Sequence, residues 1–261
     1  MRLWWQSFVD REQNGPYLDR LAAYLSEIAD PGTEVDVVGL SPPDRGFGRL
    51  TELRCAALAV DNALEAAAQG YDAFTFGHFQ DPGLYEARSA VEIPVVGLGE
   101  ASLHWAAQLG RHLALVTIDP VFDRYHAEQA DRYGLGGRVR HVVGLGLTVE
   151  DFEPAFAGEE GATARLAGIF AELVRPAVDA GADVIVPAGA LVSLVLAGEH
   201  GLTIGHAPVV NSVAVALKQT ETAVKLRALT GLGPSRGPSF AAPPQVALDD
   251  FRRFVARGRD G

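Results

Sequence analysis

Short runs of β-branched and apolar residues alternate with longer alanine-rich stretches along almost the whole chain. The short runs predict buried strands, and the longer stretches have the apolar spacing of helices. Regular alternation of this kind is typical of α/β proteins with mostly parallel sheets covered on both faces. The predicted strands are residues 3–6, 34–39, 73–77, 95–97, 112–117, 139–143, 184–186 and 209–210, and the predicted helices are residues 16–28, 50–69, 83–90, 100–109, 122–132, 162–180, 191–199 and 212–230.

One sequence signal occurs twice. Gly70-Tyr71-Asp72-Ala73-Phe74 and Gly181-Ala182-Asp183-Val184-Ile185 each join a glycine that can end a helix to a short polar turn and a buried strand. The recurrence suggests two related halves. In open sheets of this class, ligands bind at the carboxyl ends of the strands, so candidate chemistry is sought there.

The chain changes character after Gly231. Residues 231–261 form a tail that begins rich in Pro, Gly and Ser, as in Gly233-Pro234-Ser235-Arg236-Gly237-Pro238, which is typical of a linker. The tail ends in a short amphipathic pattern at residues 248–255, which could form a docking helix.

Composition and charge narrow the class of protein. The 261 residues are 48% hydrophobic and 21% charged, values typical of a globular chain. A net charge of −11 without a basic cluster argues against nucleic acid as a partner, whereas a small anionic substrate remains compatible. No apolar run approaches the roughly 20 residues that cross a bilayer, and residues 1–10 do not resemble a signal peptide. A single cysteine excludes an internal disulfide, and we expect a cytoplasmic protein without a membrane partner.

The segment from Gly77 to Leu84 holds the most informative side chain. It follows a predicted strand and opens a predicted helix, with Asp81 placed to cap that helix and Pro82 in its first turn. His78 should therefore stand at the carboxyl end of a strand, where loops commonly carry functional sites. A helix cap with an incidental histidine is the alternative interpretation.

This segment, together with four others, resembles the hydantoin racemase branch of the aspartate/glutamate/hydantoin racemase superfamily. The similarity covers roughly residues 1–230. It is carried, in order, by Gly77-His78-Phe79-Gln80-Asp81-Pro82-Gly83-Leu84, Ile93-Pro94-Val95-Val96-Gly97-Leu98-Gly99-Glu100-Ala101, Leu113-Ala114-Leu115-Val116-Thr117-Ile118, Gly181-Ala182-Asp183-Val184-Ile185-Val186-Pro187-Ala188-Gly189 and Pro208-Val209-Val210-Asn211.

The resemblance implies two pseudosymmetric, Rossmann-like α/β lobes with the site in a cleft between them. We expect a first lobe of residues 1–98 and 208–230, a second lobe of residues 99–207, and the tail of residues 231–261. The resemblance further implies an isomerase that needs neither pyridoxal phosphate nor any other cofactor or metal. Its substrate would be a small carboxylate or cyclic amide, and the protein would be a homo-oligomer.

Enzymes of this family use two cysteines, one from each lobe, on opposite faces of the substrate's acidic carbon. Carried over by position, the first cysteine falls on His78 and the second on Gly189, so neither thiol is present. Cys55 does not replace either of them, because it lies within a predicted helix and is best interpreted as a small packed residue.

The loss of both thiols leaves several mechanisms open. His78 remains a candidate acid/base, since an imidazole with an ordinary pKa near 6.5 suits proton transfer near neutrality. Glycine at position 189 carries no proton-transfer group. Racemisation then requires another residue or water, whereas a lyase, decarboxylase or isomerase step needs a group on one face only. A non-catalytic protein that binds a small ligand is the third possibility.

Further candidate substrate contacts lie at the ends of the predicted strands. Gln6 and Ser7 end the first strand, where the family's polar substrate contacts lie. For Thr117 and Asn211, ligand contact and helix capping are equally compatible with the sequence. The predicted site consists of the catalytic positions His78 and Gly189, the binding residues Gln6, Ser7, Phe79, Gln80, Thr117, Ile118, Ala188 and Asn211, and no metal ligands.

Overall fold

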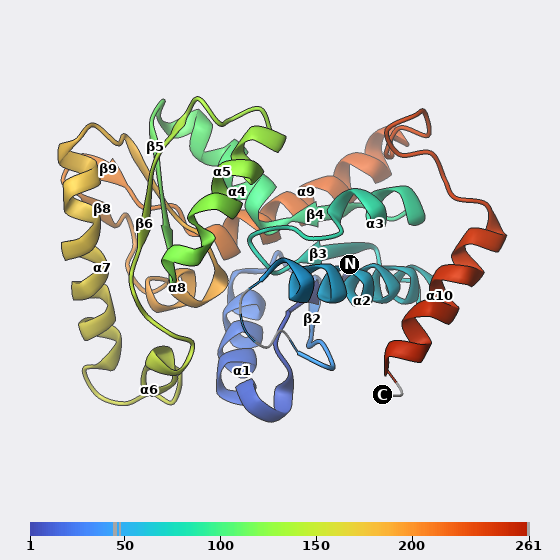
Figure 1. Cartoon of the computed structure of the whole chain (residues 1–261), viewed down its shortest axis with the longest axis horizontal. Helices are drawn as coiled ribbons and strands as arrows, with labels where there is room; N and C mark the ends of the chain where they lie inside the picture. The colour runs from blue at the N-terminus through green and yellow to red at the C-terminus, as the bar shows by residue number, and fades with distance from the viewer. Residues whose placement is uncertain (44–45, 47, 260–261) are drawn as a thin grey trace.

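The computed structural model describes residues 1–43, 46 and 48–259, and its strands form two parallel sheets and a small hairpin (Figure 1). The strand order is β2-β1-β3-β4 in the first sheet and β6-β5-β7 in the second. The α/β class with mostly parallel sheets is confirmed. The strands are β1 (Arg2–Gln6), β2 (Glu34–Val38), β3 (Ala73–Phe76), β4 (Val95–Gly97), β5 (Leu113–Thr117), β6 (Val139–Gly144), β7 (Val184–Pro187), β8 (Thr203–Ile204) and β9 (Ala207–Pro208).

Helices separate the successive strands of the two parallel sheets and cover these sheets. Figure 1 shows α7 beside the second sheet on the left, α2 and α3 over the first sheet on the right, and α4 and α5 between the two. The helices are α1 (Arg11–Ile28), α2 (Arg49–Ala68), α3 (Leu84–Ala90), α4 (Leu98–Leu109), α5 (Asp123–Arg132), α6 (Glu153–Phe156), α7 (Ala162–Asp179), α8 (Ala190–Val195), α9 (Ser212–Thr230) and α10 (Gln245–Arg259), with single 3₁₀ turns η1 (Pro120–Phe122) and η2 (Glu150–Phe152).

The two halves repeat one arrangement. β1 lies between β2 and β3, and β5 lies between β6 and β7 in the same parallel sense. The recurring aspartates also match: Asp72 accepts a hydrogen bond from the Arg2 amide at 2.8 Å, and Asp183 accepts one from the His112 amide at 2.8 Å. Each carboxylate therefore ties the start of one strand to the start of its neighbour, which explains why the same short signal precedes β3 and β7.

Several boundaries differ from the sequence prediction. α1 begins at Arg11, ahead of the predicted start, and contains a non-helical residue at Asn14 close to Pro16, where a proline inside a helix disturbs the hydrogen-bond ladder. The predicted strand at residues 209–210 is reduced to one bridge between Val209 and Ile185. The turn and helix at residues 150–156 were not predicted, because so short an element has little periodicity.

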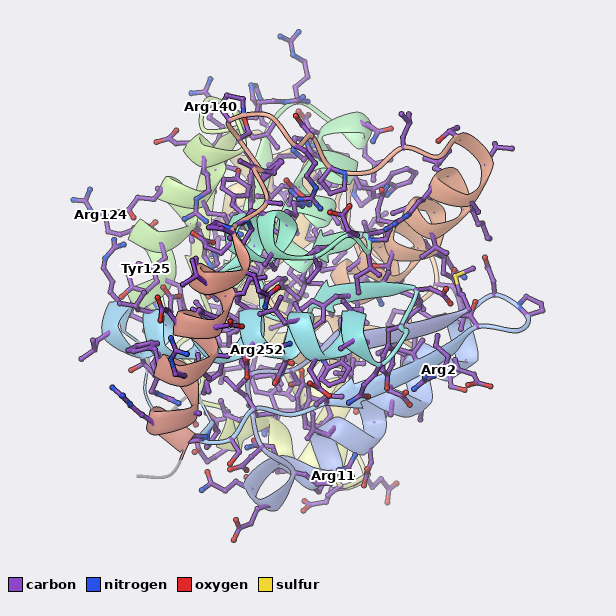
Figure 2. The ribbon with its side chains drawn as sticks, turned by 90° about the vertical axis from the view of Figure 1, so that its right-hand side faces the viewer. Arg2, Arg11, Arg124, Tyr125, Arg140 and Arg252 are labelled. Carbon is purple, nitrogen blue, oxygen red and sulfur yellow. The ribbon has the colours of Figure 1, made fainter. Side chains whose placement is uncertain are left out.

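After the second sheet the chain returns to the first one. α9 packs against β3, β4 and α4. α10 in the tail packs against α2, as Figure 2 shows from the side of the molecule that carries Arg252, and buries Val255. The lobe boundaries stay a prediction. Of the helices in the described ranges, none combines the length and apolar character that a membrane span requires.

Candidate active site

The carboxyl ends of four strands meet around one cavity. Parallel pairing brings β3 beside β1 and β7 beside β5, and the ladder continues one step further through Gly77 N–H to Gln6 O at 2.8 Å and Ala188 N–H to Val116 O at 2.7 Å. The residues after each strand consequently face one another. They enclose about 120 Å³, lined by Ser7, Phe8, Val9, Tyr17, Gly77, His78, Phe79, Gln80, Thr117, Ile118, Phe122, Val149, Ala188, Gly189, Ala190 and Leu191.

His78 lines this cavity from the end of β3. Its ring stacks on Phe8 with the centroids 4.6 Å apart, and its Nε2 is buried without a hydrogen-bond partner among the described residues. Burial, helped by the nearby His126, lowers the pKa of His78 to about 4, so the imidazole is neutral at pH 7. A neutral ring with an unsatisfied nitrogen can accept or donate a proton when a ligand arrives.

Gly189 lines the cavity from the loop after β7, in the other half of the molecule. Its φ of +155° lies in a region that side chains rarely adopt, and a Cβ built on it would meet no atom within 4 Å. The position therefore offers open space and no functional group. Strand geometry thus brings the two predicted catalytic positions to the same cavity from different sheets.

Tyr17 is a lining residue that the sequence analysis missed. It projects from α1, is hydrogen bonded to Ser7, and has a pKa raised to about 12 by burial. At neutral pH its phenol is a donor rather than a base. Tyr17 lies in a helix, and no pattern in the sequence connects it to a strand end.

Six of the eight predicted binding residues also line the cavity. Thr117 does not cap the 3₁₀ turn that follows it. Asp119 is the cap, and its carboxylate accepts a hydrogen bond from the Val121 amide at 2.7 Å. The six are Ser7, Phe79, Gln80, Thr117, Ile118 and Ala188.

Gln6 and Asn211 are not among the residues that line the cavity. The Gln6 amide is buried and already bonded, since its Oε1 accepts from Asn62 at 2.8 Å and its Nε2 donates to Ser7 O at 2.8 Å. Asn211 caps α9 by accepting from the Ala214 amide at 3.0 Å, and its amide nitrogen donates to the Tyr24 hydroxyl. For Asn211 the capping role is the one the structure supports.

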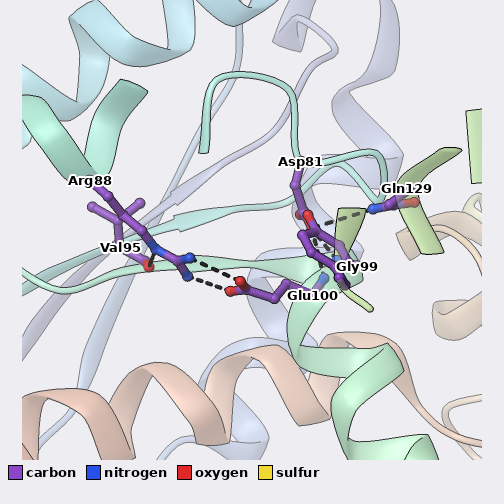
Figure 3. Close-up of polar contacts among 7 residues, drawn as sticks. Asp81, Arg88, Val95, Gly99, Glu100 and Gln129 are labelled. Atoms are coloured by element: carbon purple, nitrogen blue, oxygen red, sulfur yellow. Dashed lines mark hydrogen bonds and ion pairs between the residues drawn. The ribbon is translucent and has the colours of Figure 1, made fainter. Parts of the chain in front are cut away.

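The loop after His78 also departs from the prediction. Asp81 does not cap α3, whose N-cap is Gly83; its carboxylate instead accepts from the amides of Gly99 and Glu100 at the start of α4 (Figure 3). Burial raises the pKa of Asp81 to about 7, while hydrogen bonds from Tyr133 and these amides oppose the rise. Glu100 forms an ion pair with Arg88.

The lining is largely aromatic and aliphatic. Among the described residues that line the cavity, only His78 and Tyr17 carry titratable side chains. The uncharged polar side chains of the lining are those of Ser7, Gln80 and Thr117. The site therefore suits a small molecule with an apolar substituent and a few hydrogen-bonding atoms. No cluster of three His, Cys, Asp or Glu side chains suited to a metal ion occurs in the described part of the chain.

Comparison with known proteins places this geometry in a family. The family model described as Asp/Glu/hydantoin racemase matches residues 14–220, which is most of the chain. The chain belongs to the Asp/Glu/hydantoin racemase family. Cys55, the one cysteine of this family member, is buried in α2 and is not among the cavity-lining residues.

Two known proteins and one solved structure are similar to this chain. The chain is 28% identical to a hydantoin racemase of Rhizobium meliloti over 181 residues, 69% of each protein. It is 32% identical to a hydantoin racemase of Pseudomonas sp. (strain NS671) over 94 residues, and this match spans 38% of that protein. An allantoin racemase from Klebsiella pneumoniae shares the fold, with a TM-score of 0.78, 23% identity and 94% of both chains covered. The resemblance to the hydantoin racemase branch is confirmed.

Proposed function

We propose that this protein is a cofactor-independent enzyme that moves a proton at a carbon next to a carboxylate or carbonyl group, with His78 as the acid/base. The observation that carries the proposal is an imidazole with an unpartnered, buried Nε2 in a cavity that both sheets line. Buried polar atoms are normally hydrogen bonded, so an unsatisfied one in a cavity indicates a ligand that completes it.

Substrate binding would activate His78. With a pKa of about 4, the free imidazole is a weak base. A carboxylate or a developing enolate beside it favours the protonated ring and raises its pKa toward the value that proton transfer at neutral pH requires. Tyr17 and Thr117 are positioned at the same cavity to donate hydrogen bonds to the oxygen on which charge develops.

The other wall of the cavity favours chemistry on one face of the substrate. Gly189 supplies no group to return a proton from the opposite side. A lyase, decarboxylase or one-sided isomerase step therefore stands beside racemisation as a second candidate. A racemase on this scaffold would need Tyr17 or water as the second proton carrier.

A non-catalytic ligand-binding protein is the third candidate. Such a protein would have no need of an ionisable imidazole at the strand end that faces the ligand. Because His78 is the ionisable base at this position, the geometry supports an enzyme.

The lining also indicates the substrate class. The aromatic rings of Phe8, Phe79 and Phe122 suit an apolar or aromatic substituent, while Ser7 and Gln80 can bond an imide, amide or carboxylate. Substituted hydantoins, their open carbamoyl forms, hydrophobic amino acids and arylmalonates are the compounds to test.

Turnover of this substrate panel by wild type, His78→Ala and Cys55→Ser tests the proposal. We expect His78→Ala to lose about 10²- to 10⁴-fold in kcat, the usual contribution of a general acid/base, with an unchanged circular dichroism spectrum. Cys55→Ser should keep wild-type kcat. Full activity in His78→Ala, or complete loss in Cys55→Ser, would refute the assignment of the site.

A further inference from the structure

Asp81 has an unusual backbone for its side chain. Its φ is +51°, the one positive value among the described non-glycine residues, and its N–H donates to the carbonyl of His78 at 3.1 Å. The bond closes a tight turn over residues 78–81 directly on the proposed acid/base. A side chain persists in this conformation only where the surrounding structure holds it there.

The surroundings of the carboxylate hold the side chain in place. Asp81 Oδ1 accepts from the Gly99 amide at 3.1 Å, and Oδ2 accepts from the Glu100 amide and the Tyr133 hydroxyl, each at 2.7 Å. Gln129 donates to Oδ2 at 3.4 Å and also to the carbonyl of Phe79, next to His78. Figure 3 shows Gln129 and the start of α4 converging on this carboxylate.

Two glycines make room for the arrangement. A Cβ at Gly97 would lie 2.6 Å from the Asp81 carboxyl carbon, and one at Gly99 would collide with Phe79 O and the Gln129 amide. The fold thus leaves space at the end of β4 for one specific carboxylate. The loop after β3 is held by α4 and α5, elements that follow it in the chain.

We propose that Asp81 is a positioning residue for His78: its carboxylate fixes the turn over residues 78–81 against α4 and α5 and so sets where the imidazole stands in the cavity. The inference rests on the proposed role of His78. It goes further because Asp81 does not line the cavity, and its effect on turnover would pass through the turn.

The ionisation state of Asp81 should determine how firmly the turn over residues 78–81 is held. The ionised carboxylate accepts from all four donors, whereas a protonated one must turn an O–H toward them. The pKa of Asp81 is raised to about 7 by burial. Several titratable groups lie near the carboxylate or along the loop. They are Glu100 of α4, Tyr133 after α5, His126 of α5 (which contacts Gln129), Arg132 of α5, Glu86 and Arg88 of α3, and Arg49 and Glu52 of α2.

Asp81→Asn is the decisive variant, because asparagine tolerates a positive φ and keeps the shape of the side chain. Tyr133→Phe removes one donor from the same carboxylate. Asp183→Asn is the matched control, since Asp183 also accepts two backbone amides, those of Arg111 and His112, but at the start of β5 and β7. All four proteins are compared in folded form, checked by circular dichroism.

The first readout is the NMR titration of the His78 imidazole from pH 5 to 9, with the resonance assigned by its loss in His78→Gln. We expect a step near pH 7 in wild type and Asp183→Asn, and no such step in Asp81→Asn. The second readout is kinetic. We expect Asp81→Asn to lose about 10²-fold in kcat at little cost in KM, as misplacement of a catalytic group by about 1 Å does, and to lose the acid limb near pH 7.

A His78 resonance that titrates identically in wild type and Asp81→Asn would overturn the proposal and leave Asp81 a structural cap. The imidazole readout needs no substrate. Failure of the proposed function, seen as no turnover by wild type, is therefore distinguishable from failure of the positioning role, which the resonance decides alone.

Discussion

Adjacent residues at the end of β1 have different surroundings. Gln6 and Ser7 follow each other in the sequence, yet Ser7 lines the cavity and Gln6 is bonded within the core. Successive side chains in a strand point to opposite faces. Both faces of β1 are buried, so the sequence could place the pair at a strand end but could not tell which of them lines the cavity. His78 and Thr117 were predictable because each immediately follows or ends a strand with a clear apolar pattern.

Gly189→Cys tests whether the cavity wall at position 189 limits proton exchange to one face of the substrate. In Gly189→Cys a thiol would enter open space opposite His78, and we expect proton exchange to lose its preference for one face of the substrate. The backbone at φ +155° should make the variant less stable by about 1–3 kcal/mol. The stereochemistry of exchange and urea denaturation measure the two effects.

Gly189→Ala is the control for this substitution, because it brings the same backbone strain without a thiol. We expect it to be destabilised to a similar extent and to keep wild-type stereochemistry. Identical stereochemistry in Gly189→Cys and Gly189→Ala would mean that position 189 does not face the acidic carbon.

Helix ends in this protein are capped partly by distant residues. Asn211 caps α9 as a local N-cap, whereas α4 is capped by Asp81 from a loop that lies well before it in the chain. The sequence favours local caps because Ser, Thr, Asp and Asn before an apolar run are their usual signature. It therefore assigned Asp81 to the nearer helix, α3. The short elements η2 and α6 escaped prediction because they contain little more than one turn each.

The capping role of Asn211 is directly testable. We expect Asn211→Ala to lower the free energy of unfolding by about 1 kcal/mol, since it removes the cap of α9, and to leave kcat nearly unchanged, since Asn211 is not among the residues that line the cavity. Asn211→Asp keeps a capping oxygen and should retain most of the stability. A large loss of kcat with unchanged stability would restore Asn211 as a substrate contact.

Residues from both sheets line the cavity, so the candidate site belongs to the whole molecule and not to one half of it. Strand alternation and the repeated glycine–aspartate signal are local patterns. The sequence could therefore predict two related halves and a candidate site at the carboxyl ends of their strands. It could not predict Tyr17, Phe122 and Val149 as lining residues, since they reach the cavity through the packing of α1, η1 and η2. The homo-oligomer stays a prediction; Leu50, Leu53 and Phe254 form exposed apolar surface on α2 and α10.

Buried titratable groups make the stability of the molecule depend on pH. Burial lowers the pKa of His126 and of His78 to about 4 from an ordinary 6.5. Between these values the unfolded chain binds two protons that the folded chain does not. Asp81 acts in the opposite direction, because its raised pKa lets the folded chain bind one proton there. Two histidines outweigh one carboxyl, so these groups make the folded state less stable as the pH falls from about 6.5 to about 4.

Urea denaturation of wild type and His126→Gln at several pH values between 7 and 4 tests this predicted pH dependence of stability. His126 is fully buried. Its replacement should make the loss of stability on acidification shallower by up to about 1.4 kcal/mol per pH unit, the value for one proton. Parallel pH profiles for the two proteins would show that His126 is not held neutral by burial.

Deuterium incorporation at the acidic carbon tests the central claim most directly, namely that His78 transfers the proton from one face of the substrate. One enantiomer of an aryl-substituted hydantoin, and separately an arylmalonate, is incubated with wild type in heavy water, and product configuration and deuterium content are followed by NMR. We predict deuterium on a single face of the product, abolished by His78→Ala. Deuterium with scrambled configuration, or incorporation that persists in His78→Ala, would contradict the account.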